Sequence, residues 1–105
     1  MDILYNDADP ALQPKLEAAM IPHALRAFET PATAPAWAQC EFDGKRAYIR
    51  TLDDHCNPLV AQDMWIQNSG VEWQTADLNS SHCPFISLPE KVAEITISFV
   101  EKWID

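Results

Sequence analysis

The stretch RAYIRTLDDHCNP, residues 46–58, carries the clearest structural signal in this chain. Residues 46–51 have the composition of a short β-strand. Asn57-Pro58 is typical of a helix start, because proline is favoured in the first helical turn. Between these two signals lie Asp53 and Asp54. The stretch therefore predicts a strand, an acidic loop and a helix in immediate succession.

A second β-type run, EWQTADL, occupies residues 72–78. The helix between the two runs is expected from Pro58 to about Asn68, and Gly70 suits a left-handed C-terminal cap. A strand, a crossover helix and a second strand at this spacing predict a right-handed βαβ unit with parallel strands.

A last helix is expected to open at the capping box Ser87-Leu88-Pro89-Glu90. Its apolar residues recur at i, i+3, i+7 and i+11, which is helical spacing. They are Val92, Ile95, Phe99 and Trp103.

The first third of the chain is helical in composition but broken by prolines. Asp9-Pro10 predicts a helix start, Pro22 should end or kink that helix, and a second short helix is expected over residues 23–28. The first helix should carry an apolar stripe formed by Ala11, Leu12, Leu16, Ala19 and Met20.

The prolines and small residues of 30–35 predict a linker. We therefore expect a lid-like helical segment and linker over residues 1–36, and a βαβα unit over residues 37–105. The expected fold class is α/β.

Charge and composition exclude several function classes. A net charge of −9 with 7 Lys+Arg argues against nucleic acid and against anionic membrane surfaces. The sequence contains no run of about 18 apolar residues, so no membrane span is expected. The first residues lack the features of a signal peptide. With 2 glycines, the chain has no P-loop and no dinucleotide fingerprint. Three cysteines, an odd count, favour free thiols in a reducing compartment and hence a cytoplasmic protein.

Asp54 and His82 are the candidate site residues. Both follow the carboxyl ends of expected neighbouring strands, where open α/β sheets place their ligands. Neighbouring strands lie about 4.8 Å apart, so the two side chains are expected within hydrogen-bonding reach, as an acid and its histidine. Two alternatives remain: Asp54 as a cap of the helix at Pro58, and His82 as a structural histidine.

From Lys45 to Trp103 the chain resembles the C-terminal part of the α/β-hydrolase superfamily. It is most similar to the cofactor-free esterase branch that includes the plant methylesterase and hydroxynitrile lyase group and microbial relatives. The matching runs are residues 48–54 with 57–58, 62–64, 70–72 and 80–90. The resemblance implies that Asp54 and His82 are the acid and the histidine of a catalytic triad, with Asp53 as the competing acid. It also implies ester or related acyl-bond hydrolysis without a metal or an organic cofactor.

The nucleophile of that triad is missing from these residues. None of the serines stands in a Gly-x-Ser-x-Gly elbow: Ser69, Ser80, Ser81, Ser87 and Ser98. We therefore expect the 105 residues alone to be inactive, as a portion of a longer hydrolase or a truncated paralogue. The alternative is a non-catalytic module that associates with itself or with a complementing N-terminal hydrolase portion. A zinc site is disfavoured because the candidate ligands are adjacent pairs, His55-Cys56 and His82-Cys83.

Overall fold

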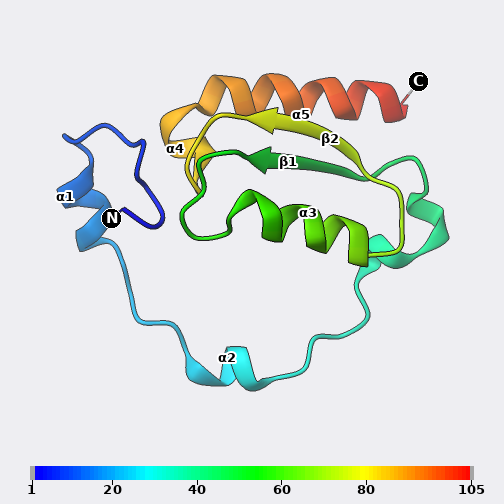
Figure 1. The fold of residues 1–105 in the computed structure, drawn as a ribbon, viewed down its shortest axis with the longest axis horizontal. Coiled ribbons are helices and arrows are strands. Elements are labelled where there is room, and N and C mark those ends of the chain that lie inside the picture. Colours follow the sequence, from blue (N-terminus) through cyan, green and yellow to red (C-terminus); the bar gives the residue numbers. More distant parts are fainter. Residues whose placement is uncertain (1, 105) are drawn as a thin grey trace.

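The computed structural model describes residues 2–104 and has a mixed α/β architecture around a two-stranded parallel sheet (Figure 1). Strands β1 (Ala47–Thr51) and β2 (Gln74–Leu78) are joined by helix α3 (Leu59–Asn68). The strands pair in parallel with Thr51 opposite Leu78, so both end at the same edge of the sheet. The parallel strand–helix–strand arrangement is confirmed, with strands that begin one and two residues later than predicted.

Two helices cover opposite faces of this small sheet. Tyr48 lines a cavity with Trp65 and Ile66 of α3, whereas Ile49 lines one with Phe99 of α5 (Pro89–Ile104). Because successive strand residues point to opposite faces, α3 and α5 lie on different sides of β1, as Figure 1 also shows. A one-turn helix, α4 (Pro84–Ser87), connects the loop after β2 to α5.

The start of α5 differs from the prediction. Ser87 lies in α4, and its hydroxyl donates a hydrogen bond to Asp7 of the N-terminal segment, 2.8 Å away. Among residues 2–104 the structure records no hydrogen bond from the first turn of α5 to Ser87. The capping-box interpretation is therefore wrong, because a carboxylate from a distant segment holds the hydroxyl instead.

The N-terminal third is less helical than its composition indicates. Helix α1 spans Gln13–Ala18 and α2 spans Leu25–Glu29, and neither has a buried residue. Between them and β1 the chain runs as a long exposed arm with two short 3-10 turns, Ala36–Ala38 and Cys40–Phe42 (Figure 1). The expected apolar stripe is only partly covered, since Leu12 and Met20 are exposed.

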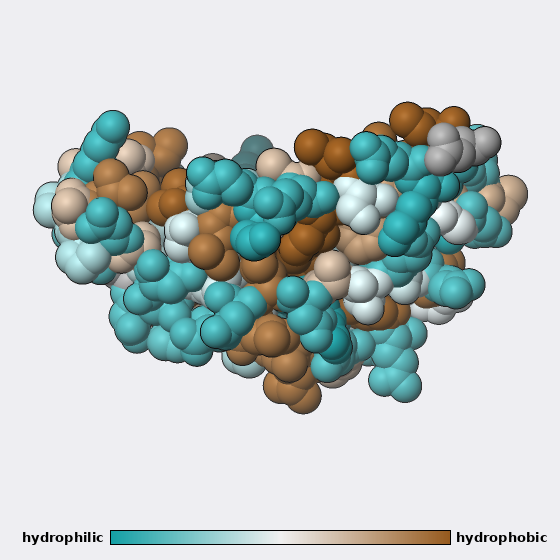
Figure 2. Space-filling view, turned by 90° about the horizontal axis from the view of Figure 1, so that it is seen from above, coloured by the Kyte–Doolittle hydropathy of each residue, from teal (hydrophilic) through white to brown (hydrophobic). Residues whose placement is uncertain are grey.

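The buried core is small. Its apolar members are Ala8, Leu78, Cys83 and Phe99, while many large apolar side chains are exposed (Figure 2). The accessible surface is 7747 Å², against about 5,900 Å² for a compact protein of this mass. The radius of gyration is 15.8 Å, against about 13 Å for a compact domain of this length. The fold therefore leaves a large surface uncovered.

None of the helices within residues 2–104 has both the length and the apolar character needed to cross a bilayer.

Candidate acid–histidine site

The loops that follow β1 and β2 run side by side at the carboxyl edge of the sheet. The N–H of Leu52 donates to the carbonyl of Leu78 at 2.9 Å, and the N–H of Asp53 donates to the carbonyl of Ser80 at 3.1 Å. These bonds extend the parallel ladder past the ends of both strands. The acid loop (residues 52–57) and the histidine loop (residues 79–83) are thereby fixed against each other.

This arrangement brings the two predicted site residues together. Nδ1 of His82 lies 2.9 Å from Oδ2 of Asp54. The Asp54 side chain is 3% exposed and that of His82 is 31% exposed, so a buried carboxylate faces a partly open imidazole. Because Nδ1–H donates to the carboxylate, the lone pair of the neutral ring lies on Nε2. Nε2 has no hydrogen-bond partner among residues 2–104.

Asp54 accepts further hydrogen bonds through both oxygens. Oδ1 accepts the N–H groups of Cys56 and Asn57, each at 2.8 Å, and Oδ2 also accepts the hydroxyl of Thr51 at 2.8 Å. Burial is the largest single influence and raises the pKa of Asp54, but the hydrogen bonds from Asn57, His82, Thr51 and Cys56 together outweigh it. The pKa therefore lies below its ordinary value, which keeps the carboxylate charged.

The alternative that Asp54 caps the helix at Pro58 is wrong, because Asp54 holds the turn before that helix instead. The N-cap position of α3 is Pro58, and no side chain caps it. The N–H groups that Asp54 holds belong to residues 56 and 57. One carboxylate thus stabilises the loop through Oδ1 and meets the imidazole through Oδ2.

The competing acid, Asp53, does not contact His82. Its carboxylate accepts the side-chain N–H of Asn6 at 3.0 Å and lies 3.5 Å from Nε2 of His55. Its side chain is 61% exposed, so it lacks the burial of Asp54.

Gln62 supports the site and was missed by sequence reasoning. It is 1% exposed, and its side-chain amide bonds both backbone groups of Thr51, accepting from N–H at 3.0 Å and donating to the carbonyl at 2.9 Å. It also donates to the carbonyl of Asn57 at 2.7 Å. Gln62 lies between Leu59 and Ile66 at helical spacing. A polar residue on the inward face of a helix was the available signal.

The thiols do not form a competing site. Cys83 is buried, and burial together with the nearby charge of Asp54 raises the pKa of its thiol, which disfavours the nucleophilic thiolate. Cys56 is exposed. In the part of the chain that the structure describes, no three His, Cys, Asp or Glu side chains are grouped to hold a metal ion.

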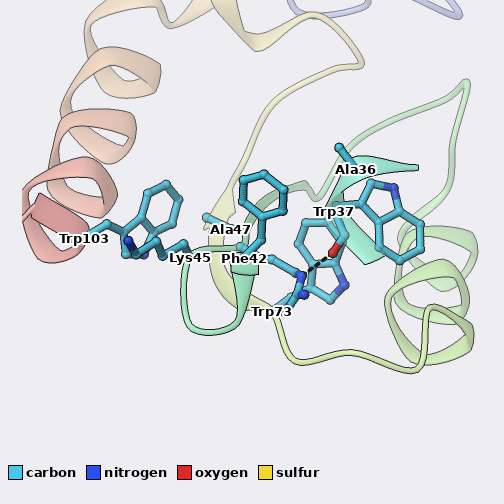
Figure 3. A pocket seen from close by; sticks show the side chains of 8 residues that line it. Ala36, Trp37, Phe42, Lys45, Ala47, Trp73 and Trp103 are labelled. Carbon is cyan, nitrogen blue, oxygen red and sulfur yellow. Dashed lines mark hydrogen bonds between the residues drawn. The ribbon is translucent and has the colours of Figure 1, made fainter. Parts of the chain in front are cut away.

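A cavity lies at the opposite, amino edge of the sheet. Its volume is about 320 Å³, and half of its eight lining residues are aromatic: Trp37, Phe42, Trp73 and Trp103 (Figure 3). Arg46, which is buried, hydrogen-bonds the carbonyl of Trp37 and so fixes the segment before β1. This cavity contains neither member of the acid–histidine pair.

Comparison with known proteins gives one hydrolase relative. The chain is 28% identical over 86 residues to the pyrethroid hydrolase of Sphingobium wenxiniae, which covers 77% of this chain and 31% of that protein. The chain thus spans about a third of the length of this relative. No family model and no solved structure matches the chain.

Proposed function

We propose that this chain carries the acid and the histidine of a serine α/β-hydrolase that cleaves carboxylic esters or related acyl bonds. The observation that carries the proposal is the 2.9 Å contact between Nδ1 of His82 and the buried carboxylate of Asp54. The similarity to a pyrethroid hydrolase supports the hydrolase class. The resemblance of the loops to the esterase branch supports the superfamily.

In this proposal His82 acts through Nε2. It takes the proton of a serine hydroxyl during attack on the acyl carbon and returns that proton to the leaving alcohol. Asp54 holds the ring by Nδ1 and stabilises the imidazolium that forms. A carboxylate whose pKa is lowered remains charged throughout this cycle.

The nucleophilic serine comes from outside these 105 residues. The two serines before His82 are buried with engaged hydroxyls: Ser80 donates to the carbonyl of Ser81, and Ser81 donates to that of Leu4. Neither stands in a glycine-flanked elbow. A histidine and an aspartate without the serine cannot form an acyl-enzyme.

A chimera tests the proposal. The matched segment of the pyrethroid hydrolase is replaced by that of this chain, and release of 4-nitrophenol from 4-nitrophenyl butyrate is measured. We expect turnover that falls about 10³-fold or more in both His82→Ala and Asp54→Ala. Asp53→Ala is the matched control and should stay within about threefold, since the Asp53 side chain does not contact His82 and its backbone carbonyl still accepts from Asn6. A folded, active chimera that tolerates His82→Ala would contradict the proposed role.

The 105-residue chain alone should give no turnover above background. Activity of the purified chain that His82→Ala abolishes would show that these residues contain their own nucleophile. Activity that survives His82→Ala would come from another site or from a contaminant.

A second candidate function is a module that associates with another chain. The surface in excess of a compact protein, about 1,800 Å² by the size scaling, favours it. The two-stranded sheet also leaves one edge of β1 without a neighbouring strand in the described residues. The partner would be a second copy or the nucleophile-bearing portion of a hydrolase.

A further inference from the structure

The N-terminal segment folds back over the carboxyl edge of the sheet. Residues 4–8 form a turn closed by the N–H of Ala8 and the carbonyl of Tyr5 at 3.1 Å, and Ala8 is 5% exposed. Figure 1 shows this segment beside the loops that follow the two strands. Its contacts reach residues more than 70 positions later in the chain.

Asp7 of this turn accepts hydrogen bonds from residues on both sides of His82, one in the histidine loop and one in α4. Oδ2 of Asp7 accepts the backbone N–H of Ser81 at 2.9 Å and the hydroxyl of Ser87 at 2.8 Å. Ser81 is fully buried and directly precedes His82, while Ser87 ends α4 just after it. One carboxylate oxygen thus spans the segment that carries the imidazole.

The same turn also grips the acid loop. The side-chain N–H of Asn6 donates to the backbone carbonyl of Asp53 at 3.2 Å and to its carboxylate at 3.0 Å. Asp53 directly precedes Asp54. Neighbouring residues of one turn therefore hold the two loops whose side chains form the acid–histidine pair.

The Asp7 bonds are of the strong, charge-assisted kind. Burial is the largest influence and raises the pKa of Asp7, but the hydrogen bonds from Ser81 and Ser87 outweigh it and hold the pKa below its ordinary value. A carboxylate that accepts from a buried N–H makes bonds roughly twice as strong as neutral ones. Its loss would free the backbone next to the imidazole.

We propose that Asp7 is a positioning residue for His82. Asp7 acts through Ser81 and Ser87, and its bonds to them hold the imidazole against Asp54. The inference rests on the proposed function only for its effect on turnover. Its structural content concerns the His82–Asp54 hydrogen bond and is measurable without any substrate.

The first test is NMR of the full chain labelled with ¹⁵N-histidine. The chain has 3 histidines, so His23→Gln and His55→Gln assign the remaining signal to His82. The wild type should show a single neutral tautomer with the proton on Nδ1, and that proton should be strongly deshielded and slow to exchange. In Asp7→Ala we expect about tenfold or faster exchange of this proton and a mixture of tautomers, since about 1.4 kcal/mol of lost restraint is a factor of ten.

Three variants separate positioning from general stability. Ser87→Ala removes one of the two bonds and should give a smaller increase in exchange than Asp7→Ala. Asp9→Ala removes the same kind of side chain two residues away and should leave the His82 signal unchanged. Among residues 2–104, the Asp9 carboxylate accepts only from the N–H of Ala11 at 2.9 Å. Ser69→Ala, which loses the bond from the Trp73 indole at 2.9 Å, should lower stability without changing that signal.

The outcomes distinguish this inference from the proposed function. A wild type without the Nδ1–H signal would overturn the acid–histidine pair itself. A wild type with the signal and a folded Asp7→Ala that retains it unchanged would overturn the positioning role alone. If Asp7→Ala does not fold, Asp7→Asn and Ser87→Ala decide: faster exchange in both supports the proposal, and wild-type exchange in both overturns it.

The same chimera, extended to carry all 105 residues of this chain and therefore Asp7, provides the catalytic readout. Displacing a catalytic group by about 1 Å costs about 10²-fold in rate. Asp7→Ala should therefore lower kcat by about that factor and leave KM within about threefold, because Asp7 is not expected to touch substrate. An unchanged kcat in a folded variant would contradict positioning.

Discussion

The two oxygens of Asp54 have different tasks, and this division connects its structural and proposed catalytic roles. Oδ1 holds the turn before α3, whereas Oδ2 meets Thr51 and His82. Neutralising Asp54 would weaken every one of these bonds at once. Because the pKa of Asp54 is lowered, its contribution to stability should decrease as the pH falls.

We expect Asp54→Asn to be less stable than the wild type at pH 7 by about 2–3 kcal/mol, since bonds to a buried charged group contribute about 1.5–3 kcal/mol each and the amide keeps some of them. A carboxylate with a lowered folded-state pKa stabilises the fold above its unfolded value of about 3.9, and this stability is lost as the pH falls through the folded pKa. The difference between variant and wild type should thus shrink between pH 7 and pH 3. Urea unfolding at both pH values measures it.

Asp9→Asn is the control for this titration, because Asp9 is exposed and its carboxylate accepts a hydrogen bond from the N–H of Ala11 within its own turn. Its stability difference from the wild type should stay within about 0.5 kcal/mol at pH 7. A difference for Asp54→Asn that is equally large at pH 3 would show that the amide disrupts packing and that the charge is not the cause.

At this scale the sequence predicted two candidate site residues, which the structure brings together, and it missed two residues that hold their loops. Asp54 and His82 were predictable because each follows a recognisable strand by a few residues. Gln62 left a faint signal, a polar residue on an inward helix face. Asp7 left none, because its partners Ser81 and Ser87 lie 74 and 80 positions away and no local pattern encodes such contacts.

Among the elements, α3 and β1 are coupled through a buried amide. Gln62→Leu would leave the N–H and carbonyl of Thr51 without their partner, and each buried unsatisfied group costs about 1–3 kcal/mol. We expect a loss of about 2–4 kcal/mol in urea unfolding at pH 7. Gln67→Leu, an exposed position of the same helix, should change stability by about 0.5 kcal/mol or less. Equal effects of the two substitutions would contradict the role of the amide.

Gly70 ends α3 in the conformation that its sequence position predicts. Its φ is +69°, and a Cβ there would meet no atom within 4 Å. Gly70→Ala should therefore cost only the conformational penalty, about 1–2 kcal/mol. Gly70→Asn should cost less than Gly70→Ala, since asparagine visits this conformation more readily. Thermal and urea unfolding of the two variants rank them, and the reverse order would contradict a purely backbone origin.

Local patterns predicted the strands and the helix between them to within two residues, because composition, a proline start and a glycine stop all agreed there. They failed where an element has no covering layer. The apolar stripe expected in the first helix gains little burial in α1, which is accordingly short. Ser87 matched a capping box, but the Asp7 carboxylate holds its hydroxyl.

For the whole molecule, the uncovered surface is the main energetic feature. A two-stranded sheet is marginal in water by itself, and this one has a helix on each face but an open edge along β1. The carbonyl of Arg46 accepts a hydrogen bond from Gln74 of β2, and the N–H of Leu52 donates one to Leu78 of β2. By alternation along the strand, the backbone groups of Ala47 and Ile49 point away from β2. The backbone groups of Thr51 also point away from β2, and the side-chain amide of Gln62 forms hydrogen bonds with both of them.

We expect the purified chain to associate through this edge and the exposed apolar surface beside it. The net charge of −9 opposes association, but salt at physiological strength screens charge repulsion beyond about 8 Å. An excess of about 1,800 Å² over a compact protein is more than the roughly 800 Å² that each partner buries in a standard interface. Light scattering in 0.15 M salt should give a mass above 11.8 kDa that rises with concentration.

Ala47→Pro removes an outward donor at the first position of β1, where proline is tolerated, and should reduce the mass. A monodisperse wild-type monomer with cooperative unfolding would show that the chain is self-sufficient, because it would then need no second surface to cover its sheet.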